Sequence, residues 1–173
     1  NGLNLTLRTL LGVVKYPYRK TINHKKFLYN TDYDIVKEWA RLYSISLKTI
    51  DCEIMDLADE IAYAAHDLED SLKMKYFTID DLVYEFSISK YKSSKDDLVK
   101  LIESAKTYAR KARRYETSEE YSVLFQKEFT SSLVKLLACD IGLIKSKEKY
   151  KLGYKQFENI SKGLKELTFK AVT

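Results

Sequence analysis

The sequence predicts an all-α fold, and three observations carry that prediction. Only five glycines and one proline occur in 173 residues, and so few helix breakers favour long helices over a turn-rich β architecture. Apolar residues recur at three- and four-residue spacing, which is typical of helices that bury one face. The hydrophobic share of 45% and the charged share of 32% are those of a globular chain with a core. We therefore expect a single helical unit over residues 1–173.

Periodicity and end signals place the individual helices. We expect them over residues 3–14, 32–43, 48–74, 79–86, 95–115, 118–138 and 156–172. The first helix should stop before Tyr16-Pro17, because proline disfavours helical backbone in the residue that precedes it. A basic, polar loop follows, and Thr31 or Asp32 would cap the second helix.

The third expected helix shows the clearest pattern. Its apolar stripe consists of Leu57, Ile61, Ala64, Leu68 and Leu72. These positions fall on one face of a helix, so they predict a buried stripe. Ala58, Ala62 and Ala65 lie beside the stripe, and such small side chains would let another helix approach closely.

The later helices begin at capping residues. Thr78 precedes Asp80 and Asp81, whose carboxylates suit the positive end of a helix. A Ser-Ser pair precedes the next helix. Thr117 with Glu120 has the spacing of a capping box, so it predicts the start of the helix after that.

Composition excludes several classes of protein. No apolar run approaches the roughly 20 residues that a membrane-spanning helix needs, and the first residues lack the features of a secretory signal. Cys52 and Cys139 show no CxxC spacing, so we expect reduced thiols in a cytoplasmic protein. The net charge of +5 permits a polyanionic ligand. No spacing typical of a Ser or Cys nucleophile is present.

One face of the long helix carries polar groups that could form a site. Asp59, Tyr63 and Asp67 are each four positions apart, so they form a row. The row is flanked by Asp56, Glu60, His66 and Asp70. One interpretation is a solvated helix face, since charged faces usually point to water. The other is a binding site, because a Tyr within a solvated acidic row would leave its apolar ring exposed to water.

Two stretches of the sequence carry a family resemblance. Residues 54–70, IMDLADEIAYAAHDLED, and residues 2–17, which include Lys15-Tyr16-Pro17, resemble segments of bacterial dGTP triphosphohydrolase-like proteins of the HD-domain superfamily. Lys26-Phe27 resembles the next family segment, and the likeness returns at residues 164–169. The resemblance implies a multi-helix HD-domain-like bundle that lacks its N-terminal HD half. Residues 1–85 would be the second half of the phosphohydrolase core, and residues 86–173 an associated helical region.

The resemblance assigns roles to the acidic row. Asp59 matches the last metal ligand of the HD site, where a carboxylate would complete the coordination of a divalent ion such as Mg or Mn. Tyr63 matches the residue that packs against the deoxyribose and disfavours an added 2′-hydroxyl. Asp67 matches the residue that accepts from the 3′-hydroxyl.

The same resemblance implies phosphate contacts and a reaction. Lys15 and Tyr16 of the Lys-Tyr-Pro run, and Lys26, would bind the triphosphate of a dNTP. The family reaction cleaves the bond between the 5′-oxygen and the α-phosphorus, which converts dGTP to deoxyguanosine and tripolyphosphate. The family enzymes are phosphoric ester hydrolases. The resemblance also implies that the protein is a homo-oligomer.

The family's catalytic residues have no match in this sequence. Its catalytic His and Glu, and the His, His and Asp that complete the metal site, lie upstream of Gly2. With no initiator Met, we therefore expect a piece of a longer protein that is inactive alone. His66-Asp67 spells an HD dipeptide, but one His and one Asp make an incomplete metal site.

Other interpretations are a non-enzymatic helical module and a regulatory paralogue with a decayed site. The module would bind a protein partner or single-stranded nucleic acid. Its candidate surface is the basic helix face of Lys106, Arg110, Lys111, Arg113 and Arg114, with Tyr108 and Tyr115 to stack on bases. That face can equally be a solvated one. Trp39, Cys52 and Cys139 are expected in the core, and His24 in a polar loop.

Overall fold

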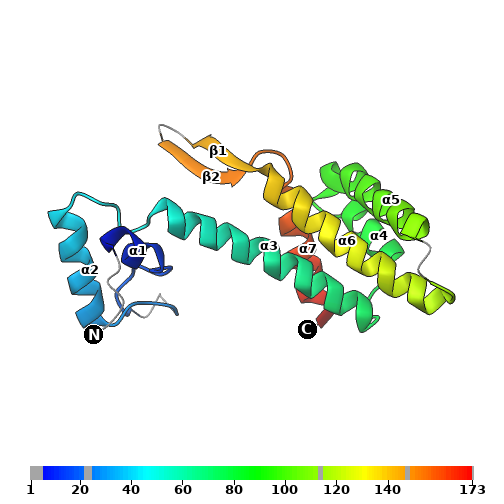
Figure 1. The fold of residues 1–173 in the computed structure, drawn as a ribbon, viewed down its shortest axis with the longest axis horizontal. Helices are drawn as coiled ribbons and strands as arrows, with labels where there is room; N and C mark the ends of the chain where they lie inside the picture. The colour runs from blue at the N-terminus through cyan, green and yellow to red at the C-terminus, as the bar shows by residue number, and fades with distance from the viewer. Residues whose placement is uncertain (1–5, 22–24, 113–114, 147–148, 173) are drawn as a thin grey trace. The chain divides into compact units, whose positions relative to one another are not determined.

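The computed structural model describes residues 6–21, 25–112, 115–146 and 149–172. The helices and strands of this part of the chain are α1 Leu7–Gly12, α2 Asn30–Leu42, α3 Ile50–Lys73, α4 Ile79–Ile88, a 3-10 turn η1 Lys92–Ser94, α5 Lys95–Ala112, α6 Ser118–Asp140, β1 Ile141–Ser146, β2 Lys149–Tyr154 and α7 Glu158–Val172 (Figure 1). The predicted all-α class is confirmed as the main architecture. The small antiparallel sheet was not predicted from the sequence.

Contacts divide the chain into two compact units, one up to Ala58 and one from Asp59 onward. Helix α3 supplies the last residues of the first unit and the first helix of the second. The functional boundary expected at residue 85 stays a prediction. No helix in the described ranges is both long and apolar enough to cross a membrane.

The first unit has a small core built around α1 and the start of α3. Leu11 and Cys52 are fully buried, and the Cys52 thiol lies 3.4 Å from the Val14 carbonyl oxygen, to which it donates. The core position expected for Cys52 is therefore confirmed. Helix α1 starts at a Thr6 cap and ends at Gly12, before the expected end of its helix.

Two expectations about α2 were wrong. Its N-cap is Tyr29, which caps without a side-chain hydrogen bond, so neither Thr31 nor Asp32 plays that part. Trp39 is 36% exposed rather than buried, because α2 buries only Ala40. His24 lies outside the described residues.

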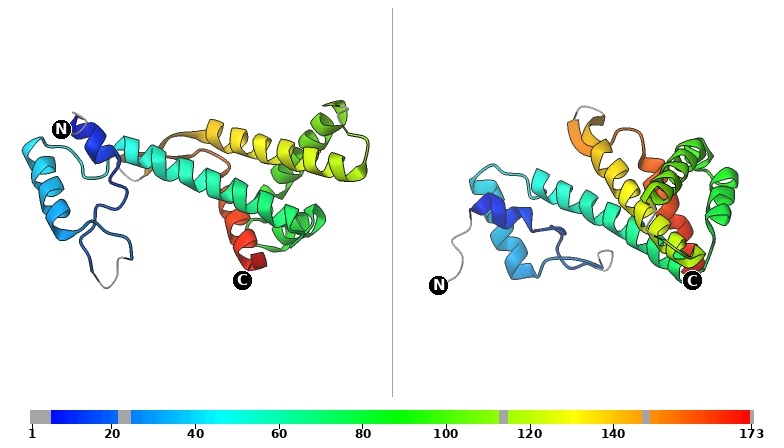
Figure 2. Two further views of the ribbon diagram at one scale, coloured as in Figure 1. Left: turned by 60° about the horizontal axis from the view of Figure 1, so that its bottom comes forward. Right: turned by 45° about the vertical axis from the view of Figure 1, so that its right-hand side comes forward.

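The second unit holds the larger core. The apolar stripe of α3 is confirmed from Ile61 onward, with Leu57 half-buried. Helices α5 and α6 pack side by side (Figure 2). The expected capping box of Thr117 with Glu120 is present. Thr78 is the expected N-cap of α4, and it forms a capping box with Asp81 that was not predicted. The fully buried large side chains of this unit are Leu68, Leu82, Phe86, Leu98, Ile102, Phe129, Leu133, Leu137, Ile160, Leu164 and Thr168.

The β1–β2 hairpin links α6 to α7. Ile141 pairs with Tyr154 and Leu143 with Leu152 in an antiparallel register. The carboxylate of buried Asp140 accepts hydrogen bonds from the backbone N–H groups of Gln156 at 3.0 Å and Phe157 at 2.8 Å. This carboxylate fixes the chain that leads into α7. Cys139, expected in the core, is exposed on α6.

Candidate functional site

A groove in the second unit brings two residues of the predicted row together. Tyr63 and Asp67 line it from α3. The side chains that complete it are Tyr91, Lys162, Lys165, Glu166, Phe169 and Lys170. The groove encloses about 670 Å³, which is within the range of small-molecule sites. Tyr63 is 63% exposed and Phe169 is 70% exposed, so two aromatic surfaces are available to a ligand.

Asp59, the predicted metal ligand, is half-buried on α3 one turn before Tyr63. A carboxylate oxygen is a suitable ligand for Mg or Mn. Within the described ranges, no three His, Cys, Asp or Glu side chains are grouped as a metal site requires. The role of Asp59 as a metal ligand stays a prediction.

The HD dipeptide does not act as a pair, because its two side chains lie in different hollows. His66 lines a hollow with Glu69 of α3 and Lys127 of α6. Asp67 lines the groove with α7. Consecutive helix residues point in directions about 100° apart, and here each direction meets a different neighbouring helix.

Hydrogen bonds between segments far apart in sequence hold α7 beside α3. The Ser161 hydroxyl donates to Glu60 Oε1 at 3.2 Å, and the Tyr154 hydroxyl donates to Ser161 Oγ at 3.3 Å. Burial raises the pKa of Tyr154, so this donor keeps its proton. Glu60, which flanks the predicted row, therefore acts as an anchor for α7.

Glu166 is the most strongly held ionised group of the groove. It accepts hydrogen bonds from Lys90 Nζ at 2.9 Å, the Tyr91 hydroxyl at 2.8 Å and Lys170 Nζ at 3.1 Å. The bonds from Lys90, Tyr91 and Lys170 lower the pKa of Glu166 from about 4.5 to about 2. Glu166 thus stays negative at any physiological pH and ties α7 to the segment between α4 and α5.

This pKa shift predicts a pH-dependent contribution to stability. The folded-state pKa of Glu166 is depressed, so the contribution is present above pH 4.5 and is lost as the pH falls toward 2. We expect the melting temperature to be lower in Glu166→Gln than in the original chain at pH 7. The difference should shrink between pH 4.5 and pH 2, measured by circular dichroism. A difference that is constant with pH would show that the carboxylate's charge is not responsible.

The α7 side of the groove was not predicted from the sequence. Lys162, Lys165 and Phe169 lie on α7, and only the returning family likeness at residues 164–169 pointed to this segment. The pKa of Lys162 is raised by its hydrogen bond to Glu158, 2.8 Å away, so Lys162 is positively charged at neutral pH. The groove therefore offers ammonium groups close to the exposed rings of Tyr63 and Phe169.

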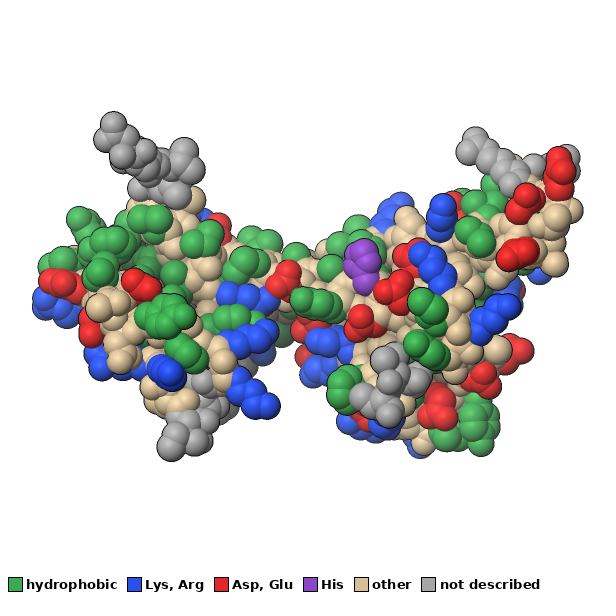
Figure 3. Space-filling view, turned by 90° about the horizontal axis from the view of Figure 1, so that it is seen from below, with side chains coloured by type: hydrophobic (Ala, Val, Ile, Leu, Met, Phe, Trp, Pro, Cys, Tyr) green, Lys and Arg blue, Asp and Glu red, His purple; other side chains and the backbone are tan. Residues whose placement is uncertain are grey.

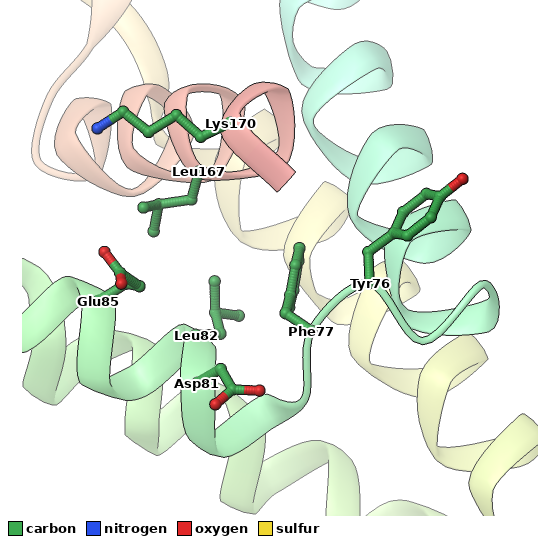
Figure 4. Close-up of a pocket in the computed structure, with 7 residues that line it drawn as sticks. All are labelled: Tyr76, Phe77, Asp81, Leu82, Glu85, Leu167 and Lys170. Atoms are coloured by element: carbon green, nitrogen blue, oxygen red, sulfur yellow. The ribbon is translucent and has the colours of Figure 1, made fainter. Parts of the chain in front are cut away.

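A second hollow of about 360 Å³ lies between α4 and α7. Figure 4 shows Phe77, Leu82 and Leu167 pointing toward one another from the α3–α4 loop, α4 and α7. Asp81 at its edge is engaged in the capping box with Thr78. Lys170 reaches the Glu166 carboxylate. Asp81 and Lys170 thus have structural partners, which favours a role in packing for this hollow.

The predicted phosphate-binding residues lie in the first unit, and the structure brings all three together. Lys26 Nζ donates to the Tyr16 hydroxyl at 3.1 Å. The Lys15 and Lys26 ammonium groups lie 5.8 Å and 5.0 Å from the centre of the Tyr16 ring. Lys15 also lies 3.6 Å from an Asp56 carboxylate oxygen. Figure 3 shows Lys and Arg side chains gathered on one face of this unit, on the left of the view.

The basic face of α5 has internal partners. Lys106 pairs with Glu103 at 2.8 Å, and the Tyr115 ring packs edge-on against Tyr121 with 5.1 Å between ring centres. Arg113 and Arg114 lie outside the described residues. Binding of nucleic acid by this face stays a prediction.

Comparison with known proteins finds several that are similar to this chain. It is 46% identical to "Deoxyguanosinetriphosphate triphosphohydrolase-like protein 2" of Vibrio cholerae, over 99% of this chain and 42% of that protein. It is 40% identical over 77 residues to a deoxyguanosinetriphosphate triphosphohydrolase-like protein of Corynebacterium efficiens, covering 41% of this chain and 18% of that protein. A Shewanella protein of the same name is 32% identical over 44% of this chain and 27% of its own length.

The chain thus spans about two fifths of the Vibrio relative and less of the others. No family model matches the sequence. No solved structure matches it either. The Vibrio alignment includes the predicted row of α3, the lysines of the first unit and all of α7, because it covers nearly the whole chain.

Proposed function

This chain is a part-length relative of the deoxyguanosinetriphosphate triphosphohydrolase-like proteins, and we propose on that premise that it is part of a metal-dependent dNTP triphosphohydrolase. The observation that supports this most directly is the groove. Tyr63 and Asp67, which the family resemblance assigns to the sugar, line one hollow together with lysines and the exposed Phe169 ring.

In this proposal the described residues bind and orient the substrate. The Tyr63 ring packs on the deoxyribose and disfavours a ribose by shape. Asp67 accepts a hydrogen bond from the 3′-hydroxyl. Lys15 and Lys26, with Tyr16, neutralise the triphosphate. Fixing the sugar and the phosphates sets the position of the 5′-oxygen to α-phosphorus bond that is cleaved.

Asp59 would hold the divalent ion, Mg or Mn, together with His, His and Asp ligands from outside this chain. When bound, such an ion activates water and stabilises charge on the phosphoryl oxygens. We propose that the catalytic His and Glu also come from outside the chain, and that the whole protein acts in the cytoplasm as a homo-oligomer.

The test is hydrolysis of the four dNTPs with Mn²⁺, read out as tripolyphosphate. We expect release by a longer polypeptide that supplies the missing ligands, and no turnover by the 173-residue chain alone. Inorganic phosphate or pyrophosphate as the only phosphorus product would contradict the proposed bond cleavage. Binding of dNTPs by the longer protein without turnover would instead indicate a regulatory paralogue.

A further inference from the structure

Two lysines of the first unit share one carboxylate. Lys48 Nζ lies 2.7 Å from Asp56 Oδ2, and Lys15 Nζ lies 3.6 Å from Asp56 Oδ1. Asp56 is on α3, whereas Lys48 precedes that helix and Lys15 follows α1. Since Lys15 and Lys48 are 33 positions apart in the sequence, their common partner is a product of the fold.

Tyr16 connects a third ammonium group, that of Lys26, to Lys15. Its ring lies next to both Lys15 and Lys26, and its hydroxyl accepts from Lys26. We call Lys15, Lys26 and Lys48 the lysine cluster. Cation–π and hydrogen-bond contacts of this kind orient ammonium groups without neutralising them.

The lysine cluster holds three positive charges in the first unit. Two of its ammonium groups share the Asp56 carboxylate, and Glu53 adds a weaker negative field at Lys48. The hydrogen bond to Asp56 raises the pKa of Lys48, so Lys48 is fully charged at neutral pH. Clustered like charges cost free energy unless a counter-ion joins them, and a polyphosphate supplies several negative oxygens at once.

Asp56 is a replaceable partner. The Lys48 side chain is 45% exposed and that of Asp56 is 29% exposed, and ion pairs this accessible to water are weak. Phosphate oxygens carry more negative charge than one carboxylate, so they compete well for the same ammonium groups. Asp56 can therefore position Lys15 and Lys48 until phosphate oxygens bind these ammonium groups in its place.

We propose that Lys48 is a third polyphosphate-binding lysine beside Lys15 and Lys26, and that Asp56 is the internal counter-ion that the polyphosphate displaces. The ligand is the polyphosphate chain of a nucleoside triphosphate. The inference rests on the proposed function for the identity of that nucleotide.

The experiment is calorimetric titration of the full chain with inorganic tripolyphosphate at constant ionic strength. Lys48→Met should weaken binding about tenfold, the loss of one charged hydrogen bond. Lys37→Met is the matched control, because it removes the same charge from the same unit at a lysine that lies over Tyr33 instead. Its effect should stay below about twofold. Asp56→Asn should tighten binding, since it removes the competing charge and keeps an acceptor.

Equal losses in Lys48→Met and Lys37→Met would overturn the role of Lys48, and weaker binding in Asp56→Asn would overturn that of Asp56. A parallel titration with dGTP should show the same tenfold loss in Lys48→Met as tripolyphosphate does. A loss confined to dGTP would also contradict the proposal, because Lys48 would then contact the nucleoside. Tripolyphosphate binding requires no turnover. An inactive longer protein would therefore contradict the hydrolase assignment without contradicting polyphosphate binding by the lysine cluster.

Discussion

Asp59→Ala is expected to lower tripolyphosphate release from dNTPs by roughly 10³-fold or more in the active longer protein, since a divalent ion contributes several kcal/mol to such reactions. The physical reason is the loss of the carboxylate that we propose as the one metal ligand from this chain. Alanine is the best helix former, and Asp59 is only half-buried in α3, so the fold should persist. The measurement is Mn²⁺-supported hydrolysis, with the bound metal content determined on the same samples.

Asp70→Ala provides the matched control for this variant. Asp70 is an exposed acid of the same helix, and its removal changes the net charge equally. We expect Asp70→Ala to keep its metal and nearly all of its activity. If Asp59→Ala also kept the full rate, the Asp59–Tyr63–Asp67 row would be a solvated helix face, and the binding-module interpretation would lead.

Gly163→Ala is expected to lower the free energy of unfolding by about 1–3 kcal/mol. A Cβ atom at Gly163 would lie 2.5 Å from Cζ and 2.9 Å from Cε1 of Phe86. Phe86 is fully buried and Tyr91, which is 3.2 Å away, is 7% exposed, so neither ring can move aside freely. The higher helix propensity of alanine, about 1 kcal/mol, offsets only part of this cost. Denaturant unfolding followed by circular dichroism gives the value.

Two further variants make the Gly163 prediction specific. At Gly142 the added Cβ would meet the flexible end of the Lys155 side chain, so Gly142→Ala should change stability by less than about 0.5 kcal/mol. Phe86→Leu combined with Gly163→Ala should cost less than the sum of the single changes, because the shorter side chain vacates the crowded space. Strict additivity would show that Phe86 is not the obstacle. Since Gly163 lies between Lys162 and Lys165 on α7, its packing also positions the groove.

The sequence predicted the features whose causes are local. Thr78 with Asp81 and Thr117 with Glu120 cap their helices across three residues, so the signal and its effect lie in the same turn. The α3 stripe from Ile61 to Leu72 is buried for a similar reason, because a repeat of three or four residues defines one helix face. The family motifs on α3 and around Lys15 could also be recognised from the sequence, since each motif is contiguous in the chain.

The sequence alone could not predict which residues share a site. Glu60 and Ser161 are 101 positions apart, and only the packing of α7 beside α3 makes them partners. The same packing places Lys162, Lys165 and Phe169 in the groove of Tyr63 and Asp67. The packing of α6 and of α7 on α3 also places His66 and Asp67 in different hollows. The exposed positions of Trp39 and Cys139 were mispredicted for a related reason, because burial depends on which neighbours cover a residue and not on its own hydrophobicity.

Sequence patterns therefore predicted the helical class, the buried stripe of α3, the N-cap Thr78, the capping box of Thr117 with Glu120 and the family that the α3 row resembles. Tertiary structure decided the β1–β2 hairpin, the α7 wall of the groove and the pairing of Lys15 and Lys48 through Asp56. This difference reflects how far along the chain each kind of interaction acts. Backbone hydrogen bonding and capping act within a few residues, whereas grooves and shared counter-ions arise when segments distant in the chain are packed together by burial of apolar surface.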